Sequence, residues 1–268
     1  MNIPRTFRRI VVLASLLASL PGAAPLRAAP AGATPPATPP AVDEKAKAEE
    51  EKKAHDETVK RALDVFEIEY KAKEEGVRSS AVEKLGQVKD KKILDRLTRV
   101  INGTDSDTVK TQAVRVLAGY AGDKSAARIL VSAFSTFKKK PEMLVAILDA
   151  LGELGERSVV TQVLDLYRDR NNTVARAAIM CSARIRDRVF IDPLIKMVRE
   201  FEEEVQAPVG GVASPVDDER SKRKADLQDA VGRALANITL QSFATAKEWD
   251  AWWKKNKGTF RTDPDPKK

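Results

Sequence analysis

The chain is poor in the residue types that enzyme sites and disulfide-linked folds depend on, with one cysteine, Cys181, and one histidine, His55. A lone cysteine permits no internal disulfide, so an oxidising compartment would add no covalent cross-link to this fold. These two residues are also too few for the usual structural zinc sites. Because His55 lies in a highly charged segment before the expected domain, Ser-His-Asp and Cys-His catalytic sites are excluded within that domain.

Other signatures of chemistry are missing as well. The Val-Gly-Gly-Val stretch at 209–212 has neither the spacing of a phosphate-binding loop nor a strand before it. The acidic run at 202–204 is more typical of a solvated helix end than of an acid–base pair. The apolar-rich surroundings of Cys181 indicate a small buried side chain and not a reactive thiol. The sequence therefore predicts no catalytic residue, no cofactor and no metal site.

Proline is scarce wherever the chain is rich in apolar residues. Of fourteen prolines, only four fall within residues 43–258, namely Pro141, Pro193, Pro208 and Pro215. Strand-type alternation is missing from this region, and apolar residues recur there at spacings of about three and four. The pattern predicts an all-α fold.

The N-terminus has the pattern of an export signal. Arg5, Arg8 and Arg9 precede an apolar run at 10–20, which is followed by Pro21 and a stretch of small residues. This order is typical of a signal peptide, here residues 1–28, cleaved after Ala28. The run is shorter than the roughly 20 apolar residues that span a bilayer. We therefore expect export and no membrane insertion after cleavage, with a retained N-terminal anchor as the alternative.

Cleavage would change the charge of the protein. The formal net charge falls from +8 to +4, because residues 1–28 contain four arginines and no acidic residue. The lower charge and the export signal both argue against a nucleic-acid partner. Residues 29–55, which are rich first in proline and alanine and then in charge, predict a tether. Residues 261–268 are expected to be a disordered tail.

Five segments of the chain repeat one pattern: VRSSAVEKLGQV from Val77, VKTQAVRVLAGY from Val109, MLVAILDALGEL from Met143, VARAAIMCSARI from Val174 and LQDAVGRALANI from Leu227. The tenth residue of each segment is small: Gly86, Ala118, Gly152, Ala183 and Ala236. A small residue at a fixed helical position lets a neighbouring helix approach closely. A second apolar helix is expected after each of the first four segments.

This pattern resembles the HEAT-repeat family, especially its short bacterial type, and the segment ALGELGERSVVTQVLDLY at 150–167 is the most similar. The resemblance covers about residues 57–258 and implies a repeat domain at 56–260. The fold it implies is a right-handed α-solenoid of about five helix pairs with a capping helix at the C-terminus. The fourth repeat departs from the pattern, with ARIRDRVF where the third has GELGERSVV.

All three tryptophans lie within residues 249–253 of a chain that is 5% aromatic. Thr245 and Glu248 form a capping-box pattern that begins a helix at Ala246. The three rings, Trp249, Trp252 and Trp253, then share one helical face. They could form a stacking platform for a ligand or cover the end of the core. Because the last helix has no successor to cover it, we expect a structural cap.

Two surfaces are candidate partner-binding regions. The second helices should line the concave side of the solenoid, with polar residues that form a mildly basic ridge: Arg96, Arg99, Arg128, Gln162, Asp165, Lys196 and Arg199. The other candidate is a loop expected at 202–224, where the spacing between repeats is longest. Within it, Ser214, Pro215, Asp217 and Asp218 are typical of a helix start.

The sequence thus predicts an exported, non-enzymatic scaffold, periplasmic or extracellular, that binds another protein. A module that binds an acidic polymer of the cell envelope is the alternative. A HEAT-like enzyme is a more remote one, because relatives in that family attach bilin pigments or excise damaged DNA bases.

The export signal makes a direct prediction about the mature protein. N-terminal sequencing of protein recovered from the producing cells should begin within a few residues of Ala29, because the small residues before it suit signal peptidase. An intact Met1 on protein from the cytosol would contradict this prediction.

Overall fold

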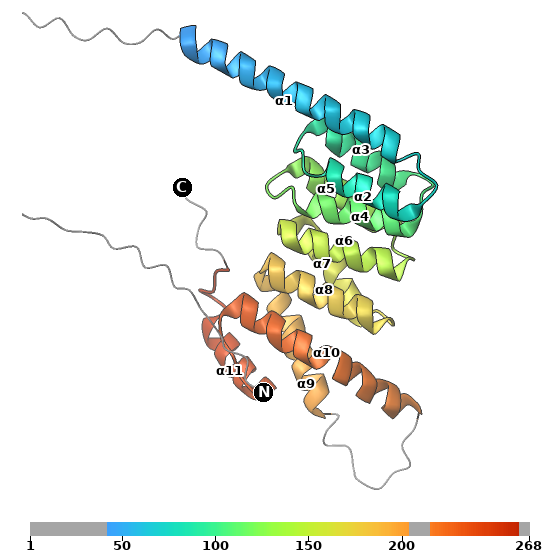
Figure 1. The fold of residues 1–268 in the computed structure, drawn as a ribbon. Helices are drawn as coiled ribbons and strands as arrows, with labels where there is room; N and C mark the ends of the chain where they lie inside the picture. The colour runs from blue at the N-terminus through green and yellow to red at the C-terminus, as the bar shows by residue number, and fades with distance from the viewer. Residues whose placement is uncertain (1–41, 204–214, 263–268) are drawn as a thin grey trace, which may run out of the picture. The chain divides into compact units, whose positions relative to one another are not determined.

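The computed structural model describes residues 42–203 and 215–262, which fold into eleven α-helices and three short 3-10 helices without a β-strand (Figure 1). The prediction of an all-α fold is therefore confirmed. Several expected features lie outside the described residues: the signal peptide at 1–28, residues 29–41 of the tether, residues 204–214 of the loop, and residues 263–268 of the tail.

Helices occur where the five repeated segments predict them. The helices that contain these segments are α2 (Glu75–Leu85), α4 (Asp107–Ala118), α6 (Pro141–Leu154), α8 (Asn172–Ile185) and α10 (Pro215–Thr239). We call these the first helices. The helices that follow them, the second helices, are α3 (Lys91–Asn102), α5 (Lys124–Thr136), α7 (Val160–Asp165), α9 (Ile191–Glu203) and α11 (Ala246–Asn256). The 3-10 helices are Arg157–Val159, Leu166–Arg168 and Arg188–Phe190, and α1 (Val42–Glu69) precedes all of these elements.

Short polar side chains fix where five of the eleven described α-helices begin. A side-chain oxygen of the residue before the helix accepts a hydrogen bond from a backbone N–H of the first turn at Asp90, Ser106, Asp123, Asn171 and Thr245. Such caps satisfy amide groups that have no partner within the helix, and each stabilises the helix by about 1 kcal/mol.

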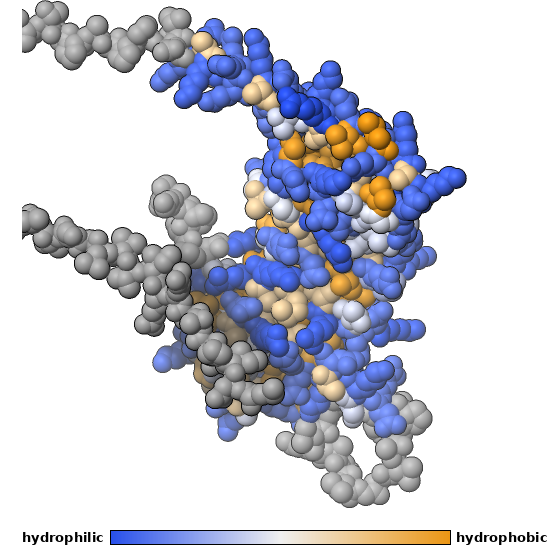
Figure 2. Space-filling view, viewed as in Figure 1, coloured by the Kyte–Doolittle hydropathy of each residue, from blue (hydrophilic) through white to orange (hydrophobic). Residues whose placement is uncertain are grey.

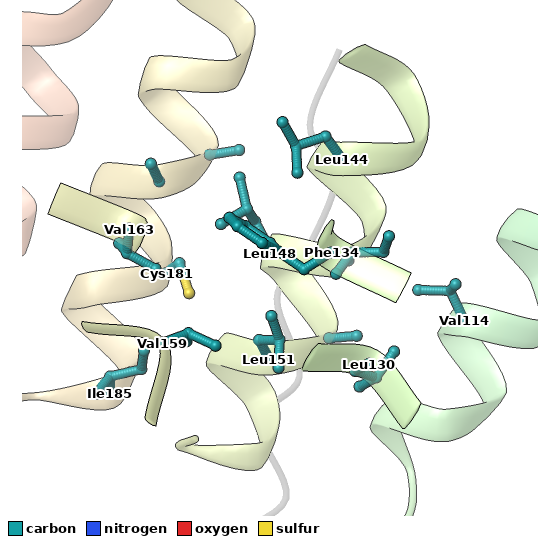
Figure 3. Packing of buried hydrophobic residues seen from close by; sticks show 14 of the residues in the cluster. Val114, Leu130, Phe134, Leu144, Leu148, Leu151, Val159, Val163, Cys181 and Ile185 are labelled. Carbon is teal, nitrogen blue, oxygen red and sulfur yellow. The ribbon is translucent and has the colours of Figure 1, made fainter. Parts of the chain in front are cut away.

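The first helices pack on one another in chain order. Helix α2 contacts α4, α4 contacts α6, α6 contacts α8, and α8 contacts α10. The repeated apolar positions point into this packing, because the fifth residue of every segment is at most 1% exposed: Ala81, Ala113, Ile147, Ala178 and Val231. In the middle of the stack, Leu148 and Leu151 of α6 lie between side chains of α5 and α8 (Figure 3).

The small residues at the tenth position allow the close approach that the sequence predicts. A Cβ atom at Gly86 would overlap the side chain of Val116 on α4. A Cβ atom at Gly152 would lie 3.2 Å from the Cα atom of Cys181 on α8, which is tighter than an ordinary contact. Glycine at these two positions therefore sets the distance between neighbouring first helices.

The fourth repeat keeps the turn of the third despite its different sequence. Helix α6 ends at Gly155 with φ 65°, and α8 ends at Arg186 with φ 57°. Both residues have the left-handed conformation that glycine adopts without strain, and a 3-10 helix follows each of them. A non-glycine residue in this conformation costs on the order of 1 kcal/mol, and burial of the surrounding apolar side chains offsets this cost.

Helix α1 is longer than the tether prediction implied. It begins at Val42, and its residues 44–58 are all exposed. The face of this half that Figure 2 shows is mainly hydrophilic. A helix without a buried face is stabilised by attraction between opposite charges four residues apart, as between Glu57 and Arg61, which lie 3.3 Å apart. Burial begins at Val59, which is 1% exposed.

The expected loop at 202–224 is helical at both of its ends. Helix α9 continues to Glu203, and α10 begins at Pro215, within the helix start that the sequence predicts. Proline suits this position, because its fixed φ and its missing N–H fit the first turn of a helix. Side chains of Arg223 and Lys224 then fix this part of α10 to neighbouring carbonyl groups, as described below.

The last helix presents an aromatic cluster to the rest of the fold. Trp249 and Trp253 are 3% and 4% exposed, and Trp252 is partly buried. The rings contact one another and two phenylalanines, Phe243 and Phe260. The predicted capping box is formed, because Thr245 accepts from the backbone of Glu248 and the Glu248 carboxylate accepts from the backbone of Thr245.

A carboxylate on α9 holds this cluster in place. The indole Nε1 of Trp253 donates to Asp192 at 2.7 Å, and the ammonium of Lys257 lies 2.8 Å from the second oxygen of the same carboxylate. The N-terminus of α11 is fixed as well, since the backbone N–H of Ala246 donates to Glu202 at 2.8 Å. Both ends of α11 are therefore attached to α9.

The buried indole should contribute strongly to stability. Trp253→Ala is expected to lower the free energy of unfolding by about 3–5 kcal/mol, because it removes a large buried ring. Trp252→Ala should cost less than half as much, because that ring is only partly buried. Urea unfolding followed by circular dichroism measures both, and hydrogen exchange should quicken first in α9 and α11. Equal losses in the two variants would contradict this account.

Candidate partner-binding groove

The residues of the predicted basic ridge lie on the second helices. Arg96 and Arg99 are on α3, Arg128 is on α5, Gln162 and Asp165 are on α7, and Lys196 and Arg199 are on α9. All except Arg96 are exposed. The structure does not bring the seven together as one free surface, because two of the arginines are engaged within the chain.

Arg96 is part of the contact between α3 and α1. Its guanidinium lies 2.9 Å from the Glu67 carboxylate and 5.0 Å from the centre of the Phe66 ring, with Tyr70 beside it. The side chain is only 22% exposed. The cation therefore covers an aromatic pair of this chain, and few of its atoms remain for a partner.

Arg199 is paired with the last helix. Its guanidinium donates to Asp250 of α11 at 2.6 Å. This hydrogen bond, together with the charge of the same carboxylate, raises the pKa of Arg199 above its ordinary value. The pair is about half exposed, so it adds little to stability, but it occupies the arginine.

Asp165 and Lys196 line a groove of about 1310 Å³ between α7, α9 and the start of α10. The apolar side chains of its floor come from both second helices and from the 3-10 helix after α7: Leu164, Tyr167, Pro193, Met197 and Phe201. Pro193, Met197 and Phe201 are spaced by four residues, so they form one stripe along α9.

The rim of the groove carries residues of both charge signs. Its basic members are Arg168, Lys196, Arg220 and Arg223, and its acidic members are Asp165, Asp192, Glu200 and Glu203. Arg168 and Glu200 form an ion pair at 2.9 Å. Asp165 and Lys196 have no ion-pair partner among the described residues, so their charges are available to a ligand.

Hydrogen bonds from α10 and α8 hold the walls of the groove. Arg223 donates to the carbonyl oxygens of Tyr167 at 2.6 Å and Asp169 at 2.8 Å, and Lys224 donates to the carbonyl of Phe201. The Tyr167 hydroxyl donates to Ser182 of α8 at 2.6 Å. Burial raises the pKa of this hydroxyl above its ordinary value, which favours the protonated form that donates this bond.

A second groove runs along the first helices. Its volume is about 600 Å³, and it lies mainly between α4 and α6. Small side chains such as Ala118, Ala146 and Ala150 form its floor, and polar and charged side chains surround it. It lacks the large apolar side chains that anchor most partners, so we favour the groove on α9.

The groups with reactive side chains lie elsewhere. Cys181 is fully buried, as the sequence predicts, and burial raises the pKa of its thiol to about 12. His55 lies on α1, with its Nε2 atom 3.5 Å from Asp90. Within the described part of the chain, no three histidine, cysteine or acidic side chains converge as a metal site, and no helix is long and apolar enough to cross a bilayer.

The chain matches no family model and no curated protein.

Several residues of the groove were not predicted from the sequence. Tyr167, Arg223 and the start of α10 become neighbours only because α10 packs on α8, and the long spacing before the fifth repeat hides that contact. The stripe of Pro193, Met197 and Phe201 does have a signal, namely apolar residues every fourth position on a predicted helix.

The two arginines Arg96 and Arg128 should behave differently when truncated. Arg96→Ala is expected to lower the free energy of unfolding by about 1–2 kcal/mol, since it removes the ion pair and the aromatic contact with α1. Arg128→Ala should change it by less than about 0.5 kcal/mol, because its side chain is exposed. Urea unfolding of both variants tests the difference. If Arg96→Ala left the free energy of unfolding unchanged but abolished partner binding, Arg96 would belong to the partner-binding ridge after all.

Proposed function

We propose that this chain is an exported, non-enzymatic scaffold of HEAT-like helix pairs, and that its groove on α9 binds a segment of a partner protein. The observation that carries the proposal is the groove itself, with an apolar floor and a rim of both charges. Such a surface suits the recognition of a polypeptide, because apolar side chains supply affinity and paired charges supply specificity.

The packing of the helices supports the HEAT-like part of the proposal. The first helices α4, α6 and α8 each contact the first helix before and the first helix after them in the chain, as the helix pairs of an α-solenoid do. In a right-handed solenoid of five such pairs, α11 is the terminal helix, and its aromatic cluster would serve as the C-terminal cap. The buried indoles of Trp249 and Trp253 favour this role over a stacking platform for a ligand.

An amphipathic helix fits the groove best. Three apolar residues at successive intervals of four span about 12 Å along α9, which matches about two turns of a docked helix. The partner would place apolar side chains against Met197 and its neighbours, and charged side chains opposite Asp165 and Lys196. This mode of recognition recurs where an apolar groove runs beside a helix.

A polymer of one charge fits the groove less well. An acidic envelope polymer would be attracted by the four basic residues of the rim but repelled by its four acidic residues. The exposed Arg99 and Arg128 lie on other helices, and their charges are ordinary for a protein surface. Export, and with it a periplasmic or extracellular place of action, rests on the pattern of residues 1–28.

Site-specific crosslinking tests the proposed groove. A photoreactive amino acid at Lys196 of the full chain should crosslink one protein from an extract of the cell envelope. The same group at Lys124, an exposed position on α5, is the matched control and should not. Equal crosslinking at the two positions would contradict the assignment of the groove.

Charge reversal separates the protein partner from the polymer. Lys196→Glu should slow association with the crosslinked protein about tenfold, because a charge at the rim steers encounter, whereas Arg128→Glu should change it less than twofold. Binding should persist at high salt, since the apolar floor contributes to it. Equal losses in both variants, with a steep dependence on salt and retention on heparin, would favour the polymer instead.

A further inference from the structure

Exposed apolar side chains gather at the N-terminal end of the helix stack. Among the described residues, five large hydrophobic side chains are exposed, and three of them are on α1 and α2: Val65 at 48%, Ile68 at 74% and Val77 at 42%. Figure 2 shows hydrophobic surface where the C-terminal half of α1 meets α2 and α3. The other two, Val189 and Leu240, lie on a 3-10 helix and beyond the end of α10, far from each other in sequence.

An apolar groove of about 270 Å³ lies beside these residues, between α1 and α2. Its apolar lining is contributed by both helices: Ala62, Val65, Phe66, Ala81, Leu85 and Val88. Ile68 stands one turn after Val65 on α1, so a protruding side chain and a hollow are neighbours on this surface.

The position of α2 explains why this groove is open. Every other first helix in the middle of the stack has a first helix on each side of it, whereas α2 has only α4. Helix α1 contacts both α2 and α3, as the ion pairs Lys84–Glu69 and Arg96–Glu67 show. Helix α1 alone therefore covers the end of the layer formed by α2 and α3, and it leaves part of α2 uncovered.

The charges around the groove are balanced within one copy of the chain. Arg61 and Lys84 lie at its edge with Glu69, and each cation has an acidic neighbour, Glu57 at 3.3 Å from Arg61 and Glu69 at 2.8 Å from Lys84. Because these charges cancel within one copy, two such surfaces do not repel each other when they meet across a two-fold axis. A strongly acidic or strongly basic partner would not be attracted here.

We propose that the chain forms a two-fold symmetric dimer through this end, with Ile68 of each copy inserted into the groove between α1 and α2 of the other. A protruding side chain and its hollow on one surface are what an isologous contact requires. The contact is independent of the groove on α9, which lies toward the other end of the stack. Because the patch is small, we expect association at concentrations on the order of 10 μM.

Sedimentation of the mature full chain between about 1 and 200 μM tests the proposal, since this range brackets the expected affinity. The wild-type protein should pass from monomer to dimer across this range. Ile68→Glu should weaken association on the order of a hundredfold and leave a monomer, because it places a charge in an apolar contact. The matched control is Leu240→Glu, at a side chain that is 75% exposed, and it should associate like the wild type.

A cysteine at the contact gives an independent readout. The chain's own Cys181 is fully buried, so a thiol introduced by Ile68→Cys would be the accessible one. A short bis-maleimide linker that reaches from the introduced thiol of one copy to that of the other should trap a covalent dimer of that variant with unchanged helicity, whereas Val189→Cys should give no covalent dimer. A wild-type chain that is monomeric at the highest concentration, or association that Ile68→Glu does not weaken, overturns the proposal.

Discussion

The close approach of the first helices is the constraint on which the rest of this structure depends. A Cβ atom would overlap the neighbouring first helix at Gly86 and would be tighter than an ordinary contact with it at Gly152. Once that spacing is set, the second helices must lie where the connecting turns allow, and their apolar faces meet in one continuous core. The groove on α9 exists because α10 follows the same spacing against α8, which brings its first turns beside the 3-10 helix at Leu166–Arg168.

Two cations complete the groove by donating hydrogen bonds to backbone carbonyl groups. These bonds fix the wall without burying an opposite charge beside each cation. Arg223 and Lys224 donate to carbonyl groups at the ends of the 3-10 helix and of α9, where the helix has oxygen atoms without partners. Such contacts fix a wall firmly without using the carboxylate of Asp165, which faces the groove. The basic residues of the ridge differ in the same way. Arg96 and Arg199 form ion pairs within the chain, whereas Lys196 has no ion-pair partner among the described residues.

The sequence predicts the helices well because their signals are local. Apolar spacing, the small tenth residue and polar residues before each helix act within one or two turns, and the structure places α2, α4, α6 and α8 accordingly. Thr245 and Glu248 form the cap that their spacing predicts. Contacts between distant residues have no such signal. The contacts of Arg96 with Phe66 and of Arg223 with Tyr167 depend on the path of the whole chain. The predicted ridge, which was defined by helix positions alone, therefore included charges that are paired within the chain.

The exposed half of α1 has a mechanical consequence. Residues 46–58 form a continuous helix with no side chain buried, which makes a rod of about 20 Å at 1.5 Å per residue. A helix of this length resists bending and twisting far better than a coil of the same composition. The rod therefore keeps residue 46 at a fixed distance from the helix stack, at the end where α1 leaves it.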